Sequence, residues 1–110
     1  MMSIIAIVLD PKNEEQAAFS VPVSTERNFE ENWLPLIKKL DLEWLPLFQT
    51  GVDIESDDLI AISEELSKLL ALAEKDLSPS IYKDLARRVN ELIKGLEKIF
   101  IEKSVTVFIG

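Results

Sequence analysis

The chain has 110 residues, 47% of them hydrophobic and 29% charged, which predicts one folded domain over residues 1–110 and excludes a disordered or low-complexity chain. It carries twenty acidic residues against twelve basic ones, a formal net charge of -8. It contains neither histidine nor cysteine, which excludes disulfides, thiolate metal sites and most familiar catalytic centres and fits the cytoplasm.

The N-terminal region predicts two strands. Residues 4–9 form a continuous, β-branched apolar run, typical of a central strand that is buried on both faces. This run is too short to be a signal peptide and follows no basic residue. Residues 19–24 alternate between apolar and small polar side chains, and Pro22 predicts a sheet edge because it cannot donate to a ladder. The turn-rich residues 10–15 favour an antiparallel hairpin between the two strands.

A helix is predicted next, because apolar residues recur at helical spacing from Phe29 to Leu40. Ser24 or Thr25 is placed to cap it. Pro35 lies inside the helix and removes the hydrogen bond to the carbonyl of Glu31, so we expect a kink or a division there.

The sequence Trp33-Leu34-Pro35-Leu36 recurs as Trp44-Leu45-Pro46-Leu47. The favoured interpretation is a chance echo, because two copies do not define a repeat. The alternative is that Trp33 and Trp44 form a partner-binding surface, since tryptophan is enriched at interface hot spots. Residues 44–50 are predicted to be extended, with Gly51 turning the chain.

Two long helices are predicted in the second half. Apolar residues recur at three- and four-residue steps from Leu59 to Ala73, and again from Tyr82 to Ile99. Pro79 suits the first position of the second helix, so the two should form an antiparallel hairpin. Gly95 inside the second helix indicates either a close approach of another backbone or simple tolerance.

Residues 105–109 alternate as a strand, which we expect to pair with the N-terminal strand. The predicted fold is therefore α+β, a small antiparallel or mixed sheet with helices packed on one face. The predicted order of elements is β-β-α-β-α-α-β.

Residues 53–58 are the densest acidic segment, and their spacing partly matches a calcium-binding loop. The carboxylates at the matching loop positions are Asp53, Glu55, Asp57 and Glu64. The loop requires glycine where this chain has Asp58, and the favoured interpretation is a helix start capped by Ser56. A small-ligand or divalent-metal module using residues 53–58 remains the alternative function.

Enzymatic activity is not expected, because no phosphate-binding loop, dinucleotide fingerprint or nucleophile elbow is present. Nothing in the sequence calls for a cofactor. The segment from Pro79 onward has six basic residues, but they are interleaved with four acidic ones, so we expect pairing on a solvated face and no nucleic-acid binding. No stretch approaches the roughly 20 apolar residues that cross a bilayer, so no membrane association is expected.

The leading functional hypothesis is a non-enzymatic interaction protein that binds a basic protein partner. It rests on a class-level analogy with small acidic inhibitor or immunity proteins. The candidate contact residues are Trp33, Trp44, Asp53, Glu55, Asp57, Asp58, Glu64 and Glu65. A homodimer is also expected, because the last helix is longer than the sheet and has a broad apolar face that needs cover.

Overall fold

The computed structural model describes residues 2–110 and contains one antiparallel sheet of four strands in the order β2-β1-β4-β3. The strands are β1 (Ser3–Leu9), β2 (Ser20–Thr25), β3 (Val52–Ile54) and β4 (Thr106–Ile109). The predicted pairing of the N- and C-terminal strands is confirmed, because β1 and β4 are hydrogen-bonded neighbours at the centre of the sheet.

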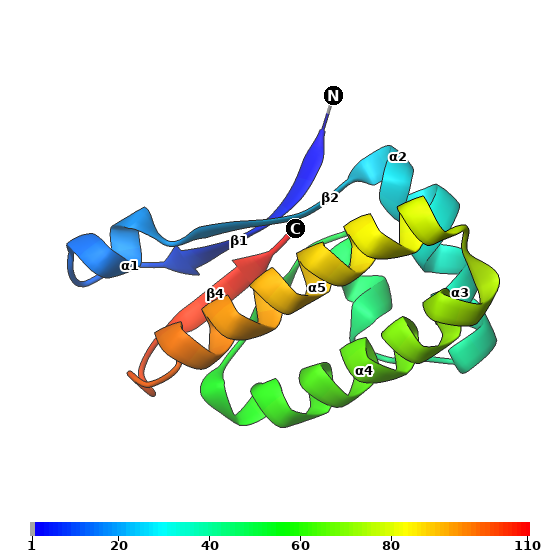
Figure 1. The fold of residues 1–110 in the computed structure, drawn as a ribbon. Coiled ribbons are helices and arrows are strands. Elements are labelled where there is room, and N and C mark those ends of the chain that lie inside the picture. The colour runs from blue at the N-terminus through cyan, green and yellow to red at the C-terminus, as the bar shows by residue number, and fades with distance from the viewer. Residues whose placement is uncertain (1) are drawn as a thin grey trace.

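The predicted helical hairpin is also confirmed. Helices α4 (Leu59–Asp76) and α5 (Pro79–Ile99) lie side by side and pack on the sheet, where α5 contacts β2 (Figure 1). The remaining helical elements are α1 (Glu14–Ala18), α2 (Glu26–Asn28), the π-helix η1 (Phe29–Trp33), α3 (Leu34–Leu40) and the 3₁₀ helices η2 (Leu45–Phe48) and η3 (Ser56–Asp58). The fold is α+β, and among residues 2–110 no helix is long and apolar enough to cross a membrane.

Strand β1 differs from the prediction, because it is buried on one face only. Ile4, Ala6 and Val8 lie in the core, whereas Ile5 and Ile7 are half-buried on the other side. The physical reason is that the helices cover a single face of the sheet. A continuous apolar run predicts two buried faces, but in this fold it forms one buried face and one apolar outer face.

Pro22 lies on an edge strand, as predicted. Ile5 and Gly110 exchange two backbone hydrogen bonds of 3.2 and 3.1 Å, so the peptide groups of Ile5 point toward β4. Successive residues of a strand direct their N–H and C=O groups to opposite sides. The peptide groups of Ala6 therefore point toward β2, where Ala6 is paired with Val21. Pro22 follows Val21, so its missing N–H lies on the free edge of the sheet, where no ladder bond is lost.

Two connecting segments differ from the prediction. The expected turn between β1 and β2 contains the short helix α1, whose first turn is capped by the Asn13 side chain accepting from the Gln16 N–H at 2.8 Å. Residues 44–50 were expected to be extended, but Leu45–Phe48 forms a 3₁₀ helix that buries Leu45 and Phe48. Both are short elements whose formation depends on contacts with the rest of the fold.

The predicted division of the helix at Pro35 is confirmed, and its form is a π-turn. The Leu34 N–H donates to the Phe29 carbonyl, five residues back. Proline has no N–H to continue the α-helical ladder, and the wider turn lets α3 begin around it. Thr25 provides the cap, because its Oγ1 accepts from the Asn28 N–H at 3.1 Å.

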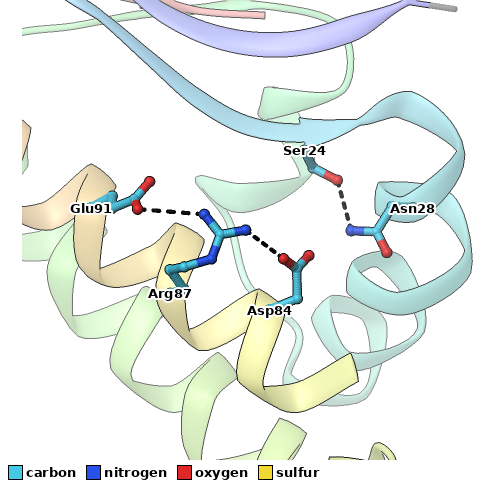
Figure 2. A network of polar contacts seen from close by, with 5 residues as sticks. All are labelled: Ser24, Asn28, Asp84, Arg87 and Glu91. Atoms are coloured by element: carbon cyan, nitrogen blue, oxygen red, sulfur yellow. Dashed lines mark hydrogen bonds and ion pairs between the residues drawn. The ribbon is translucent and has the colours of Figure 1, made fainter. Parts of the chain in front are cut away.

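Ser24 has a different role at the same junction, between β2 and α2. Its hydroxyl accepts from the Asn28 side-chain amide at 2.9 Å and donates to the Thr25 carbonyl at 2.8 Å, and Figure 2 shows the first of these contacts. Ser24 is buried, so these bonds satisfy a hydroxyl that has little contact with water.

The atoms that approach Gly95 belong to the side chains of Val21 and Phe19, and not to another backbone, which was one of the two alternatives that the sequence left open. A Cβ at this position would lie 3.0 Å from Val21 Cγ2 and 3.4 Å from Phe19 Cε2.

We predict that Gly95→Leu lowers the free energy of unfolding by about 1–3 kcal/mol, because the larger side chain must push β2 away from the helix. Urea denaturation followed by circular dichroism measures the change. An unchanged midpoint would show that the helix–strand contact is looser than these distances indicate.

One continuous hydrophobic core joins the helices to the inner face of the sheet. Its largest fully buried side chains are Trp33, Phe29 and Phe48. The Trp33 and Phe29 rings stack with their centroids 5.3 Å apart. This shared core makes residues 2–110 one structural unit.

Candidate protein-binding surface

The two tryptophans do not form an exposed pair. Trp33 is 0% exposed and belongs to the core, which corrects its assignment as a surface contact. The reason is that its helical face, together with the π-turn, directs the indole toward Phe29 and the core. Trp44 is half-buried and packs against the margin of the core. The two positions also lie in different local structures, one in a π-helix and one before a 3₁₀ helix.

The carboxylate of Glu65 is hydrogen-bonded to the chain's own backbone. It accepts hydrogen bonds from the N–H groups of Glu43 at 3.1 Å, Trp44 at 3.0 and 3.1 Å, and Leu45 at 3.1 Å. These donors lie at the start of η2, where the first N–H groups of a helical turn have no partner of their own. Glu65 thus holds η2 against α4, and its negative charge faces the positive end of that turn.

The carboxylate of Asp58 also accepts a hydrogen bond from the chain's own backbone. The Oδ2 atom of Asp58 accepts from the Glu55 N–H at 2.9 Å, and the Asp58 N–H donates to the Glu55 carbonyl at 3.0 Å. Glu55 and Asp58 therefore close the start of η3. The predicted cap at Ser56 is wrong, because Ser56 is the first residue of η3 and Glu55 holds the capping position.

The other four acidic candidates are exposed: Asp53 in β3, Glu55 at its end, Asp57 in η3 and Glu64 in α4. None of them takes part in any of the five ion-pair contacts formed within residues 2–110. In the same part of the chain, no three acidic residues come together in an arrangement that could hold a metal ion. The spacing that partly matched a calcium loop is thus not accompanied by a converging set of carboxylates.

Ile60 is an exposed apolar side chain within about one helical turn of Asp57 and Glu64. It lies in the first turn of α4, one helical turn before Glu64, and 73% of it is exposed to solvent. Beside it is an open hollow of about 510 Å³ between α4 and the end of α5. The hollow is lined by Leu59, Ile60, Ser63, Glu64, Ser67, Lys68 and Glu97. We define the acidic surface as Glu55, Asp57, Ile60 and Glu64; Asp53 is exposed elsewhere, on the sheet face that carries its register partner Phe108.

The position of Ile60 in the sequence is a signal of its exposure. Leu59, Ile62 and Leu66 belong to the series that buries one side of α4, and Ile60 lies outside that spacing. An apolar residue off the buried stripe of an amphipathic helix is a candidate for a contact with another molecule, because burial in the core does not explain it.

Of the five basic residues of α5, Arg87 alone forms an ion pair within residues 2–110, so the pairing expected from the interleaved sequence is confirmed only there. Arg87 pairs with Asp84 at 2.6 Å and with Glu91 at 3.4 Å along the exposed side of the helix (Figure 2). The hydrogen bond that Arg87 donates to Asp84 raises the pKa of Arg87 above its ordinary value. Lys39 similarly joins α3 to α4 through Asp76 at 2.8 Å. The cations that form pairs are thus matched with carboxylates outside the acidic surface.

No family model matches this chain, and neither curated proteins nor solved structures show a match to it. The assignment of a function therefore depends on the residues and geometry described above.

Proposed function

We propose that the protein is a non-enzymatic interaction protein that binds a basic protein partner through the acidic surface. The observation that supports this most directly is the absence of any intramolecular cation, within residues 2–110, paired with Glu55, Asp57 or Glu64. Exposed carboxylates of one sign attract a partner of the opposite sign and raise its rate of association.

Ile60 gives this surface an apolar contact as well as charge. Interfaces owe much of their affinity to a few well-packed anchors, and a surrounding polar rim excludes water from them. Ile60 and the adjacent hollow supply such a centre, while Asp57 and Glu64 lie one turn away on either side. We therefore expect the partner to present lysine or arginine around an apolar side chain. The cysteine-free composition fits a partner met in the cytoplasm.

The proposal predicts that neutralising the acidic surface abolishes capture of basic proteins. The test variant is Glu55→Gln/Asp57→Asn/Glu64→Gln, and the matched control is Glu14→Gln/Glu43→Gln/Glu74→Gln, which removes the same number of charges from exposed positions elsewhere. Immobilised wild-type and variant proteins are compared by quantitative mass spectrometry of the bound fraction at low and high salt. We expect the wild type and the control to bind basic proteins. The bound amount should be at least about tenfold lower on the test variant, and it should fall on every protein as the salt concentration rises.

Reconstitution with the purified captured protein then gives the affinity. Ile60→Ser is expected to weaken binding by about tenfold or more without changing the salt dependence, because it removes an apolar anchor and no charge. Equal capture by the test and control variants would contradict the proposal, since binding would then depend on overall charge and not on this surface.

A further inference from the structure

The face of the sheet opposite the helices is apolar and lacks charge at its centre. Ile5 and Ile7 of β1 and Phe108 of β4 are half-buried there, and no element within residues 2–110 covers them. We call this the outer face; its central side chains are Ile5, Ile7, Ser20, Pro22, Thr106 and Phe108. Asp53 of the edge strand β3 also lies on this face, opposite Phe108. Asp10 and Lys12 lie with Asp53 and Leu9 around a hollow at one end, so charge is confined to the β3 edge and to that end.

The Phe108 ring gives this face a defined shape. A Cβ on Gly51 would lie 2.9 Å from Phe108 Cζ, and one on Gly110 would lie 2.6 Å from the same atom. The aromatic ring therefore lies close over two glycines that have no side chain of their own. Such a ring shields the sheet backbone and leaves its other side available for contact.

The two edges of the sheet are poor sites for pairing with another chain. Pro22 lacks an N–H on the free edge of β2, and β3 has only three residues. Proline and very short edge strands are common features that prevent edge-to-edge association. Another chain can therefore contact this sheet more readily through its outer face than through its edges.

We propose that two copies of the chain associate through their outer faces, packed sheet against sheet. In a two-fold symmetric interface each surface meets its own copy, so residues near the axis face the same residues. A charged patch would repel itself there, and each copy already carries a net charge of -8. The centre of the outer face is apolar and uncharged, so two copies can meet there without repulsion between like charges. A basic partner would instead be attracted to the acidic surface.

The expected dimer is weak. Four strands about 4.8 Å apart and about 20 Å long present a smaller area than the roughly 800 Å² per partner of a standard interface. We therefore expect association at micromolar or higher concentration. This basis for a dimer replaces the predicted one, because α5 buries Leu85, Val89, Leu92, Leu96 and Ile99 within its own chain.

Sedimentation velocity of the full chain tests the proposal between about 10 µM and about 1 mM, the range expected for a weak interface. The mass should rise from 12.5 kDa toward twice that value. Ile7→Lys should raise the dissociation constant at least about tenfold, because it places like charges close to each other across the interface. The matched control Ile101→Lys introduces the same charge at a side chain that is 81% exposed and lies outside the sheet, and it should leave dimerisation unchanged.

A second measurement avoids reliance on the folding of a variant. Methyl NMR spectra of the wild-type protein over the same concentrations should show shifts at Ile5 and Ile7 and none at Ile60 or Ile101. A constant mass of 12.5 kDa, shifts confined to other methyls, or a folded Ile7→Lys variant that dimerises like the wild type would each overturn the proposal. The dimer proposal does not depend on partner binding, because the two use different surfaces. If the outer faces do not associate, the proposal for the acidic surface is unaffected.

Discussion

Replacement of Trp33 by alanine is expected to lower the free energy of unfolding by about 3–5 kcal/mol, the largest effect we predict for one side chain. Trp33 is fully buried, stacks on Phe29 and lies in the π-turn that joins α2 to α3. Its removal leaves a cavity that the surrounding helices can fill only partly. Urea denaturation, monitored by circular dichroism in the far ultraviolet, measures the loss.

The matched control is Trp33→Phe, which separates packing from the polar group of the indole. Trp33 Nε1 is buried and has no hydrogen-bond partner among residues 2–110, an arrangement that costs about 1–3 kcal/mol. Phenylalanine loses part of the ring volume but also removes this unpaired donor. We therefore expect Trp33→Phe to cost less than about 1.5 kcal/mol. A loss equal to that of the alanine variant would show that the indole N–H has an acceptor.

Those parts of the fold that depend on local patterns could be predicted from the sequence. The apolar steps in α4 and α5, the proline at the start of α5 and the alternation in β4 each specify an element and its buried side. Pro22 indicated an edge strand, and Pro35 indicated a divided helix. In each case the physical cause lies within a few residues of the feature it produces.

The features that escaped prediction depend on contacts distant in sequence. Glu65 reaches backbone groups that are 20 to 22 residues earlier in the chain, and nothing near Glu65 indicates that role. The burial of Trp33 and the partial exposure of Trp44 follow from which face of each segment meets the core, although the surrounding sequences are nearly the same. Composition located the acidic segment, but it did not separate the exposed Asp53 from the capping Asp58.

Glu65→Ala is expected to destabilise the protein by about 2–3 kcal/mol, because it leaves three backbone N–H groups without their acceptor. The charge-assisted bonds to Glu43, Trp44 and Leu45 fix the start of η2 on α4, and water can compensate them only in part because Trp44 and Leu45 are shielded. Hydrogen exchange offers a local readout: the amides of these three residues should exchange faster in the variant, while those of the central strand β1 should change only as far as the global stability does.

Glu64→Ala is the matched control, since it removes an equal charge from the adjacent residue. Glu64 is exposed and forms no hydrogen bond or ion pair with its side chain within residues 2–110. We expect its removal to change stability by no more than about 0.5 kcal/mol. The two variants should also differ in function, because Glu64 belongs to the acidic surface and the Glu65 carboxylate is directed at the backbone. If Glu64→Ala proved as destabilising as Glu65→Ala, overall charge would account for both effects and the capping role of Glu65 would be refuted.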